Sequence, residues 1–250
     1  MNKIIQKDGV KSTLELRNTS LANKLCDSVK RNIIFTITGG SGVGKDAVLN
    51  NILANNENYI KPISFTTRLP RSGEINGVDY YFISLEELQK LRENGEIFED
   101  TIVDGNIYGY TNAELERVFA TGKTPVCIVN EYGVQEICKK ENENLDVFKI
   151  FVLTPTAREL ANRLKGRELK NAITEHVKEN EGLLSRESLI GIKKKVRTIC
   201  KKRFSESKVW IKTAINGDIY DGFLVNDELI GAAEILEQTF EKAINGKITK

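Results

Sequence analysis

A glycine-rich turn between an apolar run and a lysine constrains this chain more than any other feature. Residues 33–37 read Ile-Ile-Phe-Thr-Ile, which is typical of a buried parallel strand. Residues 39–45 follow as GGSGVGK, with the spacing G-x-x-x-x-G-K of a phosphate-binding loop. In such a loop, backbone N–H groups and a helix N-terminus face the phosphate oxygens, and the lysine reaches the β- and γ-phosphates. A simple tight turn is the competing interpretation, but four glycines and a lysine in register favour phosphate binding.

The residue after the loop lysine departs from the usual pattern. A serine or threonine commonly stands there and binds Mg²⁺ through its hydroxyl, whereas this chain has Asp46. Asp46 is therefore the candidate Mg²⁺ ligand, and we expect the metal to be held in an altered way. Apolar residues at helical spacing follow it and predict a helix over 46–53.

Length and composition limit the classes of function. The 250 residues allow one large domain, or one domain with appendages, and a hydrophobic content of 40% allows a sizeable core. The net charge is only +2 with many charges of both signs, which does not favour nucleic acid or a membrane surface as a partner. No apolar run is long enough to cross a bilayer, and the scattered cysteines lack metal-site spacing. We expect a cytoplasmic protein.

Strand-like and helix-like segments alternate along the chain, which predicts an α/β domain with a parallel sheet and helices on both faces. Residues 1–31 precede the first core strand. We expect this extension to be helical, because Ser12 to Glu15 have capping-box spacing and three apolar residues recur at helical spacing. A homodimer stays open as the oligomeric state. The three apolar residues are Leu21, Leu25 and Val29.

A second informative stretch spans residues 60–82. Arg68 and Arg71 flank a proline-containing turn, with hydroxyl residues before them and a tyrosine pair after them. The planar guanidinium makes bidentate bonds to phosphate, so these arginines suit a second anion. A solvated charged loop is the competing interpretation and would be the better one if this stretch stood alone.

Five segments, in order, resemble the guanylate kinase family. They are the loop at 39–45, SFTTRLPRSGEINGVDYYF at 64–82, the region 96–109, RLKGR at 163–167 and YDGFLVND at 220–227. The resemblance spans about 32–244, which leaves 245–250 as a tail. It implies a P-loop fold with a nucleoside-monophosphate-binding region at about 60–112 and a lid at about 158–212. It also implies Mg²⁺-dependent transfer of a phosphoryl group from ATP to GMP or dGMP.

The resemblance also implies roles for individual residues. The acceptor phosphate is already anionic, so the implied reaction needs positioning and charge neutralisation but no general base. The residues implied to bind ATP are Gly40, Ser41, Gly42, Val43, Gly44, Lys45, Asp46, Ala47 and Asn226. Those implied to bind the acceptor are Ser64, Arg68, Arg71, Tyr80, Glu99, Tyr108 and Asn130. Those implied to neutralise the transferring group are Lys45, Arg163, Arg167 and Arg203.

Three departures from the family pattern keep alternatives open. Ile128 and Asn130 stand where the family has two aspartates, and Glu131 is one residue off. Tyr110 replaces a small hydroxyl residue, with Thr111 beside it. An insertion at about 168–200 carries a basic run, for which a solvated helix face competes with a phosphate-facing lid or a partner contact. The alternatives are a kinase of another phosphorylated acceptor (ribose-bisphosphate type), a catalytically impaired binding module and a regulatory nucleotide sensor.

Overall fold

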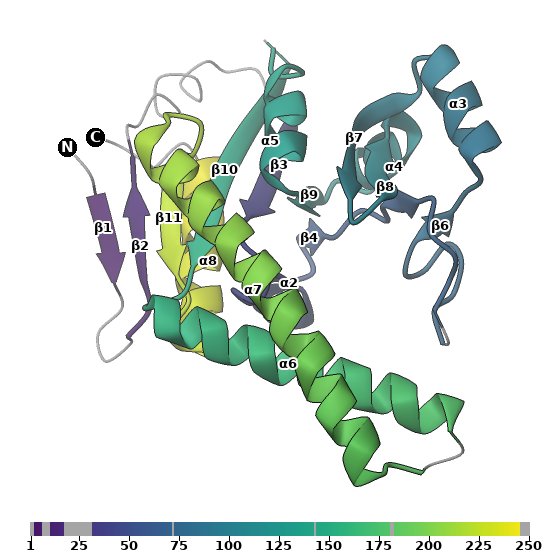
Figure 1. The fold of residues 1–250 in the computed structure, drawn as a ribbon. Coiled ribbons are helices and arrows are strands. Elements are labelled where there is room, and N and C mark those ends of the chain that lie inside the picture. The colour runs from purple at the N-terminus through teal and green to yellow at the C-terminus, as the bar shows by residue number, and fades with distance from the viewer. Residues whose placement is uncertain are drawn as a thin grey trace.

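A seven-stranded sheet forms the centre of the part of the chain that the computed structural model describes, residues 3–6, 11–17, 32–71, 73–142, 144–180 and 183–245 (Figure 1). Five adjacent strands of this sheet run parallel. A hairpin of two further strands pairs antiparallel with one edge of these five. In spatial order the strands are β1 (Lys3–Gln6), β2 (Thr13–Leu16), β11 (Gly222–Val225), β10 (Leu145–Leu153), β3 (Asn32–Thr38), β9 (Thr124–Ile128) and β4 (Tyr59–Ile60). The predicted α/β fold with a parallel sheet is confirmed.

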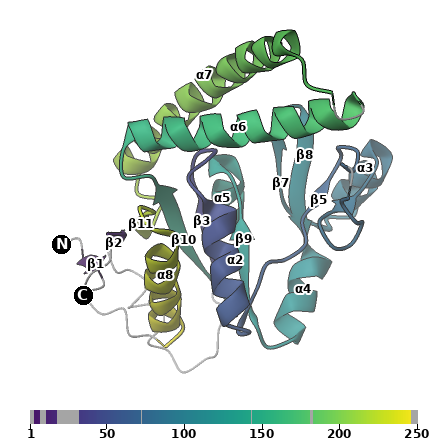
Figure 2. The same cartoon turned by 90° about the horizontal axis from the view of Figure 1, so that it is seen from below.

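Helices cover both faces of this sheet and bury its apolar side chains. Helices α2 (Lys45–Asn55) and α8 (Leu229–Ile244) lie side by side on one face (Figure 2). Their core includes Phe35 and Phe240, whose rings stack 3.8 Å apart. Helices α4 (Asn112–Ala120) and α5 (Glu131–Cys138) contribute to a second apolar cluster. Removing this apolar surface from water is the main stabilising contribution to such a fold.

A smaller sheet stands beside the main one and is built from residues inside the predicted 60–112 region (Figure 1). Its strand order is β6 (Tyr81–Phe82), β5 (Phe65–Thr66), β8 (Asn106–Thr111) and β7 (Ile97–Val103). Helix α3 (Leu85–Glu93) follows β6 and begins at a capping box between Ser84 and Glu87. The small sheet is thus separate from the main sheet and lies beside the edge formed by β9 and β4 (Figure 1).

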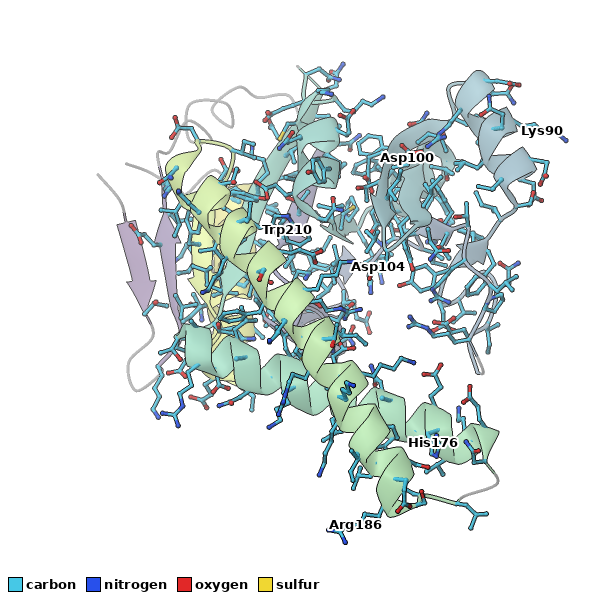
Figure 3. The ribbon with its side chains drawn as sticks, in the orientation of Figure 1. Lys90, Asp100, Asp104, His176, Arg186 and Trp210 are labelled. Atoms are coloured by element: carbon cyan, nitrogen blue, oxygen red, sulfur yellow. The ribbon has the colours of Figure 1, made fainter. Side chains whose placement is uncertain are left out.

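Two long helices form the region that the sequence predicted to be the lid. Helix α6 (Ala157–Glu179) and helix α7 (Arg186–Asn216) cross each other, and their connected ends project well beyond the sheet, where Figure 3 labels His176 and Arg186. The predicted insertion at 168–200 is the outer part of both helices. None of the described helices is long and apolar enough to span a membrane.

The N-terminal prediction was wrong where the structure describes it. Ser12 does not begin a helix of its own, because Thr13–Leu16 forms strand β2 and pairs antiparallel with β11. Alternate residues Leu14 and Leu16 are buried, as expected for a strand with one face on the core. Ser12 instead bonds to the segment just before α8: its Oγ accepts from the N–H groups of Asp227 (3.2 Å) and Glu228 (2.9 Å) and donates to the carbonyl oxygen of Glu228 (2.9 Å). The predicted helical residues Leu21, Leu25 and Val29 lie outside the described residues.

Arg17, directly after β2, ties this hairpin to the lid. Its guanidinium donates to three carbonyl oxygens at the C-terminal end of α7, those of Ala214 (3.4 Å), Ile215 (2.6 Å) and Gly217 (2.8 Å). It also lies 4.4 Å from the ring centre of Phe223. A cation at a helix C-terminus is favourable because it satisfies free carbonyls and the helix dipole.

Candidate functional site

The glycine-rich loop connects the carboxyl end of β3 to the first turn of α2. Gly39, Gly42 and Gly44 have φ angles of 147°, 88° and 95°, which L-residues with a side chain rarely adopt. A Cβ atom built at Gly39 would also lie 2.5 Å from the carbonyl oxygen of Val152. The loop therefore has the geometry that its sequence predicted, with the helix N-terminus directed toward the carboxyl edge of the sheet.

Lys45 is the first residue of α2, and its side chain folds back over the loop. Its Nζ donates to the carbonyl oxygens of Gly39 (2.8 Å) and Gly40 (3.2 Å). Burial lowers the pKa of Lys45 to about 8; neighbouring Asp46 opposes this shift, and the guanidinium of Arg167 adds to it. The ammonium is thus buried away from water, where an anion would stabilise its charged form.

Asn226 lies behind the loop. It is 3% exposed, and its Nδ2 donates to the carbonyl oxygen of Val43 at 2.8 Å. A Cβ atom at Gly44 would lie 2.5 Å from the same nitrogen. In the described residues Asn226 Oδ1 is buried without a hydrogen-bond partner. Asn226 therefore stabilises the loop through its hydrogen bond to Val43. Its contact with ATP stays a prediction.

The lid brings two of its three predicted arginines onto the loop. Arg167 Nη2 donates to Ser41 Oγ at 2.6 Å, and Arg203 Nη1 donates to the same oxygen at 3.4 Å. Arg163 instead pairs with Glu159 (2.9 Å) and reaches the carbonyl oxygen of Asp227 (3.4 Å). Arg167 and Arg203 are therefore placed for a phosphate on the loop, whereas Arg163 faces the start of α8.

Close packing fixes the lid helices above the loop. Ser207 of α7 is 1% exposed, and a Cβ atom at Gly40 would lie 2.5 Å from its Oγ. Leu164 of α6 approaches Gly42 in the same way, at 3.0 Å. The lid also touches the small sheet, because Asp104 pairs with Lys202 (3.2 Å) and Arg203 (3.5 Å); Figure 3 labels Asp104 at the edge of the small sheet near α7.

The second predicted anion site centres on Arg68. Its guanidinium makes two 2.7 Å bonds to Glu74, and its Nε donates to the hydroxyl oxygen of Tyr108 at 3.2 Å. It lies 5.0 Å from the ring centre of Tyr80. The bond from Arg68, helped by the N–H of Arg71, lowers the pKa of Glu74 to about 2 against the opposing effect of burial.

The remaining residues of this site gather on the small sheet. Ser64 precedes β5, and its carbonyl oxygen accepts from the N–H of Tyr81 at 3.0 Å. The rings of Tyr80 and Tyr108 meet edge to face at 5.9 Å. The side chain of Arg71 is exposed. Sequence reasoning missed Glu74, although a carboxylate three residues after Arg71 is a visible signal for a partner of the arginine pair.

Glu99 is a buried carboxylate with an unused acceptor. It lies on β7, is 4% exposed, and its Oε2 has no hydrogen-bond partner among the described residues. Burial, and to a lesser extent the charges of Asp100 and Glu136, raises the pKa of Glu99 to about 8. Leaving a buried polar atom unpaired costs free energy. A ligand that supplies N–H donors would remove that cost.

The side-chain amide of Asn130, just after β9, is hydrogen-bonded to other residues of the protein. Asn130 caps α5: its Oδ1 accepts from the N–H of Gly133 (2.9 Å), and its Nδ2 donates to Thr101 Oγ1 (3.0 Å). Its contact with the acceptor stays a prediction. The strand ends at Ile128, so Glu131 is already the first residue of α5 and is buried. Strand alternation therefore does not decide which way Glu131 points.

The residues that replace the small hydroxyl position also have protein partners. Tyr110 is 2% exposed, and its hydroxyl donates to the carbonyl oxygen of Ile128 at 3.3 Å. Thr111 Oγ1 accepts from the N–H of Glu114 at 3.2 Å and so caps α4. Both side chains stabilise the junction between the small sheet and the main domain.

Comparison with known proteins gives this site a family. The model of the guanylate kinase family matches residues 30–185, which is more than half of the chain. The chain belongs to the guanylate kinase family. The five motifs that predicted this membership lie together around the loop, the small sheet and the lid, and the predicted P-loop kinase fold is confirmed.

Individual relatives agree with the family match. The guanylate kinase of Mycoplasma capricolum is 37% identical over 144 residues, which are 57% of this chain and 48% of that protein. The first relatives are matched over only about half of their own length, 44–48%. The guanylate kinase of Malacoplasma penetrans is 31% identical over 223 residues, covering 87% of this chain and 97% of that protein. The crystal structure of guanylate kinase from Anaplasma phagocytophilum matches with a TM-score of 0.59 at 23% identity, over 89% of both chains.

Proposed function

We propose that this member of the guanylate kinase family catalyses transfer of the γ-phosphoryl group of ATP to GMP or dGMP. The observation that carries the proposal is the carboxyl group of Glu99, which is buried on the small sheet with one oxygen unpaired and which N–H donors of a ligand would stabilise in its ionised form. Guanine offers an N1–H and a 2-amino group to such an acceptor, and adenine lacks both donors in that arrangement. Binding the wrong base would leave the carboxylate unpaired, at a cost of about 1–3 kcal/mol.

Each half of the proposed site has its own group of cations. Lys45, Arg167 and Arg203 surround the loop and would neutralise the transferring phosphoryl group. Arg68, held by Glu74 and Tyr108, would fix the acceptor phosphate, with the exposed Arg71 beside it. The acceptor oxygen already carries negative charge, so catalysis is alignment and charge stabilisation. The lid over the loop would exclude water, which would otherwise accept the phosphoryl group.

The proposed reaction uses Mg²⁺, and one side chain of the loop suits it. Among the described residues no group of three or more His, Cys, Asp or Glu side chains forms a metal site. Asp46 offers a hard oxygen ligand beside Lys45; it is 68% exposed and pairs with Lys61 at 2.9 Å. Mg²⁺ in kinases is commonly held by one or two carboxylates with phosphates and water. Asp46 would supply that carboxylate, and the ion would neutralise phosphate charge.

A nucleotide panel tests the proposed function. ADP release is measured with Mg-ATP and each of GMP, dGMP, AMP, CMP and UMP. Release with the guanine nucleotides alone supports the proposal. Release with none of them, while GMP still binds, would instead favour a binding module, and release only with another phosphorylated acceptor would favour a different kinase of this fold.

Two variants separate the donor site from the metal site. Lys45→Ala should abolish turnover while GMP still binds, because Lys45 belongs to the ATP loop only; surviving turnover would overturn the donor-site assignment. Asp46→Ser should leave turnover equal or higher, because serine restores the usual hydroxyl ligand. A large loss in Asp46→Ser would show that a hydroxyl cannot replace the Asp46 carboxylate as the metal ligand.

A further inference from the structure

The carboxylate of Glu168 joins the two lid arginines that reach the loop. Its Oε1 accepts from Arg167 Nε (3.0 Å) and Nη2 (2.8 Å) and from Arg203 Nη1 (2.8 Å). Glu168 is 8% exposed, whereas the side chains of Arg167 and Arg203 are 41% and 29% exposed. Both guanidinium groups also donate to Ser41 Oγ. One carboxylate and one hydroxyl thus hold two cations from different helices at a single point above the loop.

Two guanidinium groups that converge in this way are stabilised by an anion between them. Like charges a few ångströms apart repel, and the repulsion grows as water is excluded. Lys45 adds a third positive charge close by, since the charge of Arg167 contributes to lowering its pKa. In this structure Glu168 is the carboxylate that bonds to both arginines. Charge-assisted bonds of this length are also directional, so the carboxylate fixes the orientation of the arginines as well as their separation.

We propose that Glu168 is a positioning residue: it holds Arg167 and Arg203 aimed at the phosphate-binding loop before the nucleotide arrives. The inference rests on the proposed phosphoryl transfer. Stabilisation of a transition state is most effective when the charged donors are in place beforehand and need not reorganise during the reaction. Long flexible arginines on two separate helices are not ordered by their own backbone, and Glu168 supplies that order.

The proposed role predicts which kinetic constant changes. Glu168 bonds to the arginines and not to the small sheet, so its loss should leave the acceptor site intact. Arginines aimed at the loop would stabilise the charge that develops as the phosphoryl group is transferred, so misdirected arginines should lower kcat more than they raise the KM for GMP. A purely structural role would lower the melting temperature without this split.

Three variants test the proposal. Glu168→Ala removes charge and acceptor and should lower kcat about 10- to 100-fold, with the KM for GMP within about twofold of the wild type. Glu168→Gln keeps an acceptor oxygen and nearly the same shape, so it should show a smaller loss even if the alanine variant folds poorly. Glu175→Gln is the matched control, because Glu175 is an exposed glutamate two turns further along α6. A kcat above that of the wild type in Glu168→Gln would overturn the proposal, since it would mean that the carboxylate competes with phosphate for the arginines.

A double-mutant cycle shows whether Glu168 acts through an arginine. Glu168→Gln is combined with Arg203→Lys, which keeps the charge but loses the planar fork. If Glu168 works by orienting Arg203, the loss of kcat in the double variant should be at least about threefold smaller than the product of the two single losses. Losses that simply multiply would overturn the positioning role.

The same series separates the inference from the proposed function. Wild-type turnover with ATP and GMP tests the function. If the wild type shows none, the dissociation constant of ATP, measured by calorimetry for the wild type and Glu168→Ala, tests Glu168 without turnover. At least about fivefold weaker ATP binding in the variant supports the positioning of the arginines, and an unchanged constant overturns it.

Discussion

Gly133 leaves the space that the buried carboxylate of Glu99 occupies: a Cβ atom built at Gly133 would lie 2.7 Å from Glu99 Oε2. Gly133→Ala should therefore displace this carboxylate. We expect at least about tenfold weaker GMP binding by calorimetry, together with about 1–3 kcal/mol lower stability from overpacking. ATP binding should be unaffected, because the glycine-rich loop is not involved.

Gly166→Ala is a matched control, for which we expect a change in stability of the opposite sign. A Cβ atom at Gly166, within α6, has no heavy atom within 4 Å. Gly166→Ala should raise stability by about 0.5–1 kcal/mol, since alanine is the better helix former. If both alanine variants lose stability equally, the space at Gly133 is not specific to Glu99.

The raised pKa of Glu99 predicts a pH-dependent difference in stability. The pKa of Glu99 is about 8 in the folded protein, whereas in the unfolded chain it has its ordinary value of 4.5. Between these values the folded state binds more protons, so the contribution of Glu99 to stability falls as the pH rises, by up to about 1.4 kcal/mol per pH unit. Glu99→Gln removes that contribution. In urea denaturation from pH 5 to 8, the free energy of unfolding of Glu99→Gln should rise relative to that of the wild type as the pH rises. If the difference between the two proteins does not change with pH, the pKa of Glu99 is not raised.

The contact between Gly40 and Ser207 predicts a suppressor pair. Gly40→Ala should push α7 away from the loop and carry Arg203 with it, because the new Cβ would meet Ser207 Oγ at 2.5 Å and Cβ at 2.9 Å. A misplacement of this kind costs up to about 100-fold in rate. Ser207→Gly removes both obstructing atoms, so the double variant should turn over faster than Gly40→Ala alone. If the second change brings no recovery, α7 is not the element that the alanine displaces.

Arg17 should stabilise the lid through its hydrogen bonds to the C-terminal end of α7. Arg17→Ala leaves three carbonyl oxygens at the end of α7 without their donor. We expect about 1.5–3 kcal/mol lower stability, seen by circular dichroism as a melting temperature lower by several degrees. Lys11→Ala, an exposed cation in the same N-terminal segment, is the control and should change stability by less than about 0.5 kcal/mol.

The sequence pattern alone predicted those parts of the site whose shape depends on the backbone angles of a few neighbouring residues. The glycine spacing before Lys45 fixed the loop, because φ angles near 90° at Gly42 and Gly44 require glycine whatever surrounds them. Alternating strand and helix patterns likewise predicted the parallel sheet. Family resemblance then located Arg68, Arg167 and Arg203, which the structure places around the loop and the small sheet.

Contacts between distant segments were not predicted from the sequence. Ser12 has the residue type and spacing of a helix cap, but its hydroxyl bonds to Glu228, 216 residues later in the chain. Asn130 and Asn226 have amides suited to a nucleotide, yet tertiary contacts already use them for α5 and for the loop. Glu168 lies next to Arg167 in sequence, but its second partner is Arg203, on another helix. Such partners depend on how the elements pack, which local propensity does not encode.

The anchoring of α7 at Arg17 has a mechanical consequence. At 1.5 Å per residue, this 31-residue helix is about 46 Å long, and only its C-terminal end is fastened by Arg17. A rotation of about 10° around that fastened end would sweep the far tip through about 8 Å. Such a rotation would move Ser207 away from Gly40 and would displace Arg203, which lies between Ser207 and the projecting end of α7. A partner that binds the projecting end of α7 would therefore change the position of Arg203 without contacting the glycine-rich loop.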